Sequence, residues 1–438
     1  MSEYMHLGAF LHGFGHHQAA WRHPSTNIDS EFSFEHYLKL TQIAERGCFD
    51  LVFLADSAGF RDWDLEALRR MPRVAVIEPI TLLAALAVST KNIGLVATAS
   101  TTYNEPYTIA RMFASLDILS GGRIGWNLVT STSESEAMNY HLTQQIAHGS
   151  RYERAAEFAA VVDGLWQSWG KDAFLRDKAS GLYFDPEKLN TLNHKGEHFS
   201  VRGPLNAPPS PQGKPVIVQA GSSEEGKALA ARTADVVFTA QPNLAAAQAF
   251  YKDLKGRMNA FDRAPSALKI LPGMLPIVGE TREEAQSLFD EMQTLVHQDI
   301  GLAQLKDLFG GFDLSSYDLD GPLPPIPETN GGKSRQQLLI DMAHRENLSI
   351  RQLYQRTTAA RGFLPLVGTA TDIADAMEQW FTQGAADGFN IMAPVMPRDL
   401  EAFVDHVVPE LQRRGLMQRV YSDKTLRGRL GVPVPVAA

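Results

Sequence analysis

Small polar side chains follow two apolar runs of this sequence, and they give the first indication of chemistry. One stretch runs from Gly121 to Ser131 and another from Ala99 to Tyr107, and each is interpreted as a strand that ends in hydroxyl and amide groups. In parallel α/β proteins the carboxyl ends of the strands meet at one face, where the reacting groups are found. The two stretches therefore predict an enzyme.

A third turn of this kind follows the apolar run 215–219. Gly221 lets the backbone approach a ligand closely, and Ser222 and Ser223 add hydroxyl donors. The helix predicted to begin there supplies unpaired N–H groups and the positive end of its dipole, and barrel enzymes often bind a phosphate at such a turn. An ordinary serine N-cap explains the same residues equally well.

Four histidines lie close together near the N-terminus: His12, His16, His17 and His23. Because imidazole is the commonest metal ligand in proteins, a metal site is one interpretation. No carboxylates accompany these histidines at a recognisable metal-binding spacing. We therefore expect no metal and favour a loop that faces a pocket, with a plain surface loop as the alternative.

Other candidate residues also lie at the ends of predicted elements. Asp56 ends the second apolar run, Thr98 lies near the end of the third, and His148 and Tyr152 lie at the start of a long helix. Each has a structural alternative, such as an Asx turn for Asp56 or local backbone hydrogen bonds for Thr98.

Apolar runs of strand length alternate with helical patterns along almost the whole chain. The alternation predicts eight strands, at 5–11, 49–55, 93–99, 123–129, 215–219, 235–239, 268–278 and 388–393. Such a pattern predicts the α/β class and a (β/α)8 TIM-like barrel rather than an open sheet. Neither a Gly-x-Gly-x-x-Gly turn after the first strand nor a Gly-x-x-x-x-Gly-Lys motif occurs, which argues against dinucleotide and nucleoside-triphosphate binding.

Two insertions interrupt the alternation. The first, at about 170–212, is predicted as a loop with a small hairpin around 196–204. The second, at about 300–346, is dense in glycine and proline and is predicted to be a lid. We expect a single domain over 1–415, followed by a C-terminal extension or tail over 416–438.

Charge and composition argue against several classes of protein. The net charge of −9 disfavours nucleic acid as a partner. No run of 18 apolar residues predicts a membrane span, and the first residues lack the features of a signal peptide. Cys48 is the only cysteine, so no intrachain disulfide can form, and a cytoplasmic location is expected.

The chain resembles the bacterial-luciferase-like flavin-dependent monooxygenases, and among them the branch of nitrilotriacetate and dibenzothiophene-sulfone monooxygenases. The resemblance lies in segments that occur in order at 17–24, 49–56, 98–107, 116–131, 151–152, 203–205 and 219–223. Together these segments are specific for the branch, but they say little about the substrate.

The resemblance implies a two-component monooxygenase. Reduced FMN (FMNH2) would come from a separate NAD(P)H:flavin reductase, and it would activate O2 as a flavin C4a-hydroperoxide to oxygenate a small organic substrate. Members of the family usually form homodimers or homotetramers. Relatives also contain a non-proline cis peptide, which would fall near Ala97-Thr98 here. The flavin contacts of the family fall on Asp56, Thr98, His148, Tyr152, Ser222 and Ser223.

We expect His17, Arg22 and Asn127 to act as hydrogen-bond donors to the peroxide or the substrate. Arg22, Arg61 and Arg361 could bind an acidic substrate. Two other functions remain open: a deazaflavin-dependent hydride-transfer enzyme of the same fold, and a non-redox metal-dependent barrel hydrolase. A barrel that binds flavin without catalysis is a third.

Overall fold

Eight parallel strands close into a barrel in the structure, which is a computed structural model that describes residues 4–60, 65–327, 333–360 and 363–433. The barrel order is β1-β2-β3-β4-β7-β8-β9-β11, and pairing of β11 with β1 closes the ring. All eight predicted strands are confirmed. Their bounds are β1 His6–Phe10, β2 Leu51–Leu54, β3 Gly94–Ser100, β4 Ile124–Val129, β7 Val216–Gln219, β8 Val236–Thr239, β9 Lys269–Val278 and β11 Gly388–Ile391.

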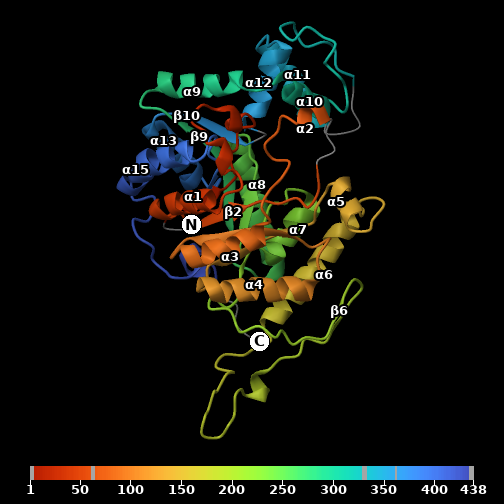
Figure 1. Cartoon of the computed structure of the whole chain (residues 1–438), viewed down its shortest axis with the longest axis vertical. Coiled ribbons are helices and arrows are strands. Elements are labelled where there is room, and N and C mark those ends of the chain that lie inside the picture. Colours follow the sequence, from red (N-terminus) through yellow and green to blue (C-terminus); the bar gives the residue numbers. More distant parts are fainter. Residues whose placement is uncertain (1–3, 61–64, 328–332, 361–362, 434–438) are drawn as a thin grey trace.

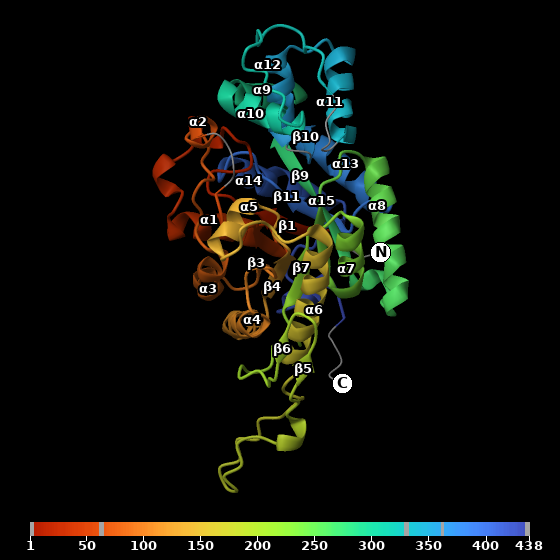
Figure 2. The ribbon, with the colours of Figure 1, turned by 90° about the vertical axis from the view of Figure 1, so that its right-hand side faces the viewer.

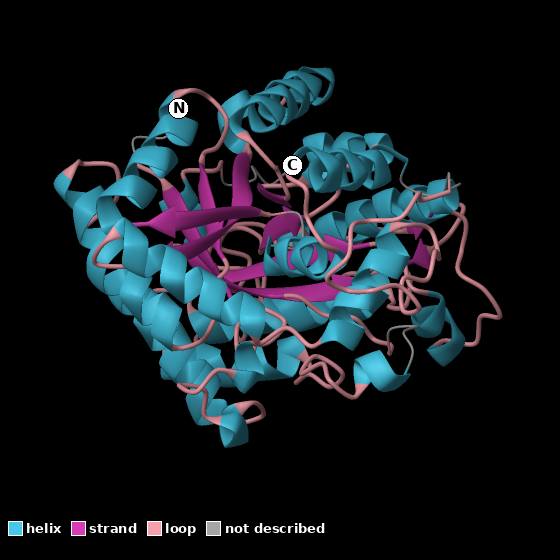
Figure 3. Cartoon of the chain, turned by 90° about the horizontal axis from the view of Figure 1, so that it is seen from above, coloured by secondary structure: helices cyan, strands magenta, loops and turns pink. Residues whose placement is uncertain are grey.

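Helices surround this ring of strands on its outside, as the view from above shows (Figure 3). The α-helices of the described residues, including those at the two ends of the barrel, are α1 Phe34–Arg46, α2 Leu65–Leu68, α3 Pro79–Ser89, α4 Pro106–Ser120, α5 Glu134–Asn139, α6 His148–Trp166, α7 Glu224–Thr233, α8 Leu244–Arg257, α9 Arg282–Thr294, α10 Gln298–Leu308, α11 Lys333–Arg345, α12 Ile350–Ala360, α13 Ala370–Thr382, α14 Arg398–Ala402, α15 Val408–Arg413 and α16 Leu426–Leu430. None of the described helices is both long enough and apolar enough to cross a membrane.

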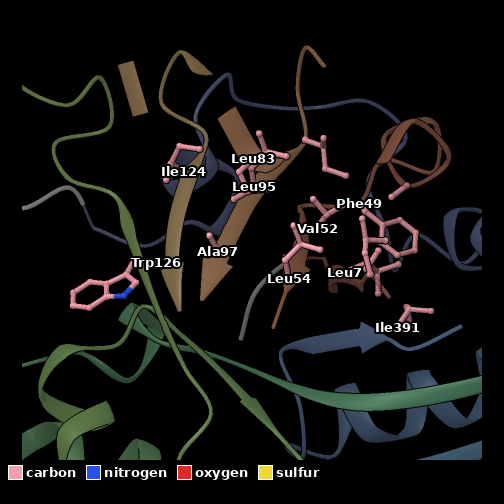
Figure 4. Packing of buried hydrophobic residues seen from close by; sticks show 14 of the residues in the cluster. Leu7, Phe49, Val52, Leu54, Leu83, Leu95, Ala97, Ile124, Trp126 and Ile391 are labelled. Atoms are coloured by element: carbon pink, nitrogen blue, oxygen red, sulfur yellow. The ribbon is translucent and has the colours of Figure 1, made fainter. Parts of the chain in front are cut away.

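The barrel strands are buried on both faces, which explains why they read as continuous apolar runs. Alternate residues such as Val52, Leu95 and Trp126 pack against the surrounding helices (Figure 4). The residues between them, including Phe53 and Val96, form a separate cluster inside the barrel. Because successive side chains of a strand point to opposite faces, one short sequence supplies both layers.

An additional strand, β10 (Leu364–Gly368), lies outside the eight-stranded ring and was not predicted. It pairs in parallel with the second half of β9, from Met274 to Val278, which extends beyond the barrel. Pro365 lies within β10, and a proline inside a short apolar run argues against a strand at the sequence level. An edge strand tolerates it, because the missing N–H faces away from the neighbouring strand.

The second predicted insertion is mostly helical rather than a loop. Helices α10, α11 and α12 pack around their own apolar cluster, which includes Leu305, Phe309, Leu353 and Tyr354. These helices lie together at one end of the molecule (Figures 1 and 2). We call them the cap. Its glycine- and proline-rich residues are confined to the connection between α10 and α11.

The first predicted insertion contains the expected hairpin and an extended arm. Strands β5 (His194–Lys195) and β6 (Ser200–Val201) pair antiparallel. The arm before them projects away from the barrel at the end opposite the cap (Figure 2). The aromatic rings of Trp169, Phe174 and Phe184 pack together where the arm leaves α6. The arm is therefore anchored by its own small aromatic cluster.

The predicted tail covers the amino-terminal end of the barrel as far as residue 433. Leu426, Leu430 and Val432 belong to the same apolar cluster as the residues inside the barrel. Between them, Arg427 is 1% exposed and pairs with both carboxylate oxygens of Asp235, at 2.8 and 3.1 Å. This segment therefore forms the floor of the barrel.

Replacing Arg427 by methionine is expected to destabilise the protein by about 3–5 kcal/mol, because it leaves the Asp235 carboxylate buried without its counter-charge. Urea unfolding measures the change. Lys424→Met, at an exposed position of the same segment, is the matched control and should change stability by less than about 0.5 kcal/mol. A loss below about 1 kcal/mol for Arg427→Met would mean that the floor does not depend on this pair.

Candidate functional site

Two cavities adjoin at the carboxyl ends of the barrel strands. The larger has a volume of about 480 Å³ and lies where β4 and β7 end, and we call it the β4–β7 cavity. The second has a volume of about 310 Å³ and lies beside the loops after β1 and β2, and we call it the β1–β2 cavity. Asp56 and Ser57 line both cavities. The carboxyl face of the barrel thus holds one continuous candidate site with two compartments.

A close approach of two backbone segments shapes the β4–β7 cavity. A Cβ atom on Gly221 would lie 3.0 Å from the Cα of Gly226, and one on Gly226 would lie 3.0 Å from the Cα of Gly221. The Tyr152 hydroxyl would lie 3.4 and 3.1 Å from these two Cβ positions. A Cβ at either position would make a contact tighter than usual, so glycine favours this close approach, and the three residues form a narrow cradle of backbone and one phenol.

The amino terminus of α7 lies at this cradle. Ser223 is its N-cap, and the Ser223 Oγ accepts a hydrogen bond from the Gly226 amide at 3.1 Å. The ordinary-cap interpretation of Ser223 is therefore what the structure shows, although the hydroxyl proton can still be donated to a ligand. Ser222 is exposed beside it. Unpaired amides and the positive end of the α7 dipole favour an anion here.

Tyr152 lines the cavity, and His148 lies one turn before it on α6. Their rings are 5.0 Å apart, and the His148 Nδ1 lies 3.8 Å from a carboxylate oxygen of Glu225 in the first turn of α7. The structure thus brings His148 and Tyr152 beside the helix that Ser223 caps, whereas His148, Ser222 and Ser223 are not among the described residues that line the cavity. Asp56 lies on the wall of the same cavity, at the end of β2.

Thr98 and Asn127 lie inside the barrel rather than on the walls of the two cavities. They are paired neighbours on β3 and β4, and the Asn127 Nδ2 donates to the Thr98 Oγ1 at 2.8 Å. The Thr98 hydroxyl donates in turn to the Leu54 carbonyl at 2.8 Å. The buried Asn127 Oδ1 has no hydrogen-bond partner among the described residues. The Thr98 hydroxyl therefore already makes two hydrogen bonds within the barrel.

The predicted cis peptide at Ala97-Thr98 is wrong. Cis peptide bonds in the described residues occur only before prolines, at Gly203-Pro204 and Met396-Pro397. The physical reason is that β3 continues as a regular strand through this position, with Ala97 opposite Trp126 and Thr98 opposite Asn127.

Two carboxylates define the electrostatics between the compartments. Burial raises the pKa of Asp56, the Ser57 amide lowers it, and the carboxylates of Glu78 and Glu136 raise it further. Glu136 is buried and accepts hydrogen bonds from the Ala58 amide at 3.0 Å and the Ser57 hydroxyl at 3.2 Å. Glu136 therefore ties the loop after β2 to α5, and it holds Asp56 at the junction of the cavities.

Sequence reasoning missed Glu136 and Arg151 as site residues. The Ser133-x-x-Glu136 spacing of a capping box was the available signal, and the box is formed. Arg151 is buried and donates to the Ser131 carbonyl at 2.6 Å, which holds the loop after β4. Nothing local in the sequence indicated that this arginine would reach across to another loop.

The side chains of the four clustered histidines lie in different environments. His12 and His16 line the β1–β2 cavity. His23 bonds to Arg398 at 2.7 Å, and His17 is buried beneath the loop. Among the described residues, no group of three or more histidine, cysteine, aspartate or glutamate side chains could hold a metal ion. The loop therefore contributes two imidazoles to the wall of a pocket.

His17 is held as a neutral imidazole. Its Nδ1 accepts a hydrogen bond from the Ala19 amide at 3.2 Å, so the proton of the neutral ring is on Nε2. Burial lowers the pKa of His17 to about 4, the side chain of Gln293 opposes this shift, and the charges of Arg73 and His23 add to it. Neither the Nε2 nor the Gln293 Oε1 makes a hydrogen bond of normal geometry in the described residues.

Arg22 lies apart from both cavities. Its Nη1 donates to the Leu295 carbonyl, and its side chain lines a third, smaller cavity with Arg70 and His297. The structure thus does not bring Arg22 together with His17 and Asn127 at one point. Arg61 and Arg361, the other arginines considered for an acidic substrate, lie outside the described residues.

Comparison with known proteins identifies the family. The sequence profile described as luciferase-like monooxygenase matches residues 9–387. The chain belongs to the luciferase-like monooxygenase family. Members of this family are flavin-dependent, and the chain is an enzyme of the monooxygenase class.

Relatives match the chain over nearly its whole length. It is 50% identical to N-acetyl-S-(2-succino)cysteine monooxygenase of Bacillus subtilis (strain 168) over 98% of this chain and 97% of the relative. It is also 50% identical to nitrilotriacetate monooxygenase component A of Aminobacter aminovorans, with the same coverage. The solved structure of EDTA monooxygenase from Chelativorans sp. BNC1 has a TM-score of 0.80 and 36% identity, and the match covers 98% of this chain and 99% of that one.

The candidate site of this family member has features that suit a flavin cofactor. The two adjoining cavities have the size and the mixed polar and apolar lining of a cofactor site. The Gly221–Gly226 cradle leaves little room for a side chain and lies at a helix amino terminus, which favours an anionic group. The hydroxyls of Thr130, Ser131 and Tyr152 line the path between the cradle and Asp56.

The neutral His17 makes stability depend on pH. The unfolded chain takes up a proton at His17 near pH 6.5 whereas the folded protein does so near pH 4. Stability is therefore fully present above pH 6.5 and is lost as the pH falls towards 4. We expect the loss between pH 7 and pH 5 to be about 2 kcal/mol smaller in His17→Asn than in the wild type.

Chemical denaturation at the two pH values measures this difference. Asparagine keeps an acceptor near the position of the Nδ1 atom, so the Ala19 amide can stay satisfied. His406→Asn, at an exposed histidine, is the control and should behave as the wild type does. Equal losses in the wild type and His17→Asn would exclude a neutral buried His17.

Proposed function

We propose that the chain is the oxygenase component of a two-component system, which takes reduced FMN from a separate NAD(P)H:flavin reductase and oxygenates a small organic substrate with O2. The observation that carries the proposal is the glycine and tyrosine cradle at the amino terminus of α7, which adjoins a second cavity through Asp56. The β4–β7 cavity suits the phosphate-bearing tail of the cofactor, and the β1–β2 cavity leaves room for a substrate beside the flavin ring.

The proposed cofactor contacts follow from this geometry. The α7 amino terminus, the hydroxyls of Ser222 and Ser223, and the Tyr152 phenol would bind the phosphate, with the His148 imidazole beside them. Asp56 would face the ring at the junction of the compartments. Burial raises the pKa of its carboxyl group, which would form a hydrogen bond with the cofactor. Thr98 would support the cofactor site from inside the barrel, where its hydroxyl donates to the Leu54 carbonyl two residues before Asp56.

Reduced FMN, when bound, supplies the chemistry that activates O2. The protein holds the cofactor and excludes water, because water at the reacting centre would divert the oxygen to hydrogen peroxide. Phe10 and Met392 give the β1–β2 cavity an apolar wall that serves this purpose. The catalytic roles expected of His17, Arg22 and Asn127 stay predictions. The Asn127 Oδ1 that is left without a partner among the described residues is an acceptor, whereas its Nδ2 donates to the Thr98 Oγ1.

Polycarboxylates are the substrate class that we propose. The relatives named above act on nitrilotriacetate, EDTA and N-acetyl-S-(2-succino)cysteine, and each of these carries several carboxylates. Among the residues that the structure describes, the wall of the β1–β2 cavity contains one guanidinium, Arg73, and the imidazoles of His12 and His16. Arg73 is held in place by the carbonyls of Gly15 and His16 at 2.9 and 2.7 Å.

Filling the cradle is expected to weaken FMN binding. In Gly221→Ala the new methyl group lies 3.0 Å from the Gly226 Cα, so the turn must open, and we expect FMN to bind at least about tenfold more weakly. Calorimetric titration with FMN measures the affinity. Gly149→Ala is the matched control, since a Cβ there meets nothing within 4 Å. Equal affinity in both variants would exclude this cradle as the phosphate site.

Oxygen use tests the reaction itself. With an unrelated flavin reductase, NADH and FMN, the protein should consume O2 and place one atom from ¹⁸O2 in a polycarboxylate, as mass spectrometry of the product would show. The methyl esters of the same substrates should react at least about tenfold more slowly. Equal rates for the acids and the esters would exclude polycarboxylates as the preferred substrates but would leave the proposed oxygenase reaction in place. Reduction of a substrate by a deazaflavin without O2 consumption would overturn the proposed reaction.

A further inference from the structure

A third cavity, separate from the two compartments, lies where the cap meets the barrel. It has a volume of about 160 Å³ and we call it the joint cavity. Its walls come from the loop after β1, from Arg70 beyond α2, and from the segment that joins α9 to α10. The residues that line it are Gln18, Ala19, Trp21, Arg22, Arg70, Leu295, Val296, His297 and Ile300.

The loop after β1 is already attached to the cap around this cavity. Ala19 packs into the apolar cluster of the cap, and the Arg22 Nη1 donates to the Leu295 carbonyl. Arg70 pairs with Asp299 of α10 at 3.1 Å. The joint cavity is therefore bounded by residues of both parts, and a ligand in it would contact both.

One buried acceptor, on a side chain that lines this cavity, has its orientation fixed by a chain of hydrogen bonds. The Thr357 carbonyl can only accept, so the Gln304 Nε2 must be the atom that donates to it, at 3.1 Å. The Gln304 Oε1 then accepts from the Gln18 Nε2 at 3.0 Å. This leaves the Gln18 Oε1, on a side chain that is only 8% exposed, without a partner among the described residues.

A cationic donor lies on the same cavity wall. Within the described residues, Arg22 uses only its Nη1, so its Nε and Nη2 are left to donate. Arg70 is neutralised in part by Asp299 and Glu66. The remaining walls at Trp21, Val296 and Ile300 are apolar. The cavity thus combines one acceptor, one anion-binding fork and an apolar surface.

We propose that the joint cavity binds a small organic carboxylate that also carries an N–H or O–H group. The carboxylate would bind the Arg22 guanidinium, which recognises carboxylates through paired N–H donors. The N–H or O–H group would donate to the Gln18 Oε1, because a buried acceptor without a partner destabilises the protein. The bound molecule would then hold the loop after β1 against the cap.

Binding to the flavin-free protein tests this inference independently of the oxygenase reaction. The probes are N-acetylglycine, which has both groups, and acetate, which lacks the N–H. In calorimetric titrations we expect N-acetylglycine to bind the wild type at least tenfold more tightly than acetate. Arg22→Met should weaken both probes at least tenfold, whereas Gln18→Met should weaken only N-acetylglycine.

Two control variants locate the site. Arg69→Met alters a neighbouring exposed arginine that pairs with Glu66 and does not line the joint cavity, so binding should be unchanged. His12→Asn alters the β1–β2 cavity and should also leave binding unchanged. Loss of binding in His12→Asn with retention in Arg22→Met would place the probe in the proposed substrate compartment and overturn the joint site. Equal affinity for the two probes in the wild type, or no binding of either, would also overturn it.

Discussion

A closed barrel of eight strands must fill its own interior, and this constraint decides where the chemistry of this protein can lie. Three phenylalanines fill the middle of the barrel: Phe10, Phe53 and Phe238 have ring centroids 4.7 to 5.7 Å apart. Below them, Leu426 and Leu430 of the C-terminal segment complete the same apolar cluster. This segment fills the amino-terminal end of the barrel interior, and barrel enzymes place their chemistry at the carboxyl ends of the strands.

The two compartments at that end have different characters, and each follows from local chemistry. The β4–β7 cavity is lined by hydroxyls and glycines beside a helix amino terminus, which favours an anion, and by the carboxylates of Asp56 and Glu136. The β1–β2 cavity combines apolar walls with Arg73 and two imidazoles. Asp56, with its raised pKa, lies between them. This division separates the groups that would hold a cofactor tail from those that would face a substrate.

The cap adds a second constraint through the loop after β1. His17 is kept neutral beneath this loop, Gln18 and Ala19 reach into the cap, and Arg22 bonds to the connection before α10. One short segment therefore contacts the barrel, the β1–β2 cavity and the cap. His12 and His16 of the β1–β2 cavity lie on the same loop.

The sequence by itself determined the eight strands, the order of strands and helices, and the residues around the turn at Gly221, because two-sided burial and helix caps leave local patterns. It could not reveal the edge strand β10, because Pro365 argues against a strand in this short run, and it could not reveal the helical nature of the cap. Only the tertiary structure decided which side chains meet: that Thr98 and Asn127 bond to each other inside the barrel, that Glu136 anchors the loop beside Asp56, and that Arg22 lies in a separate cavity. These contacts join residues distant in sequence, and no local propensity specifies them.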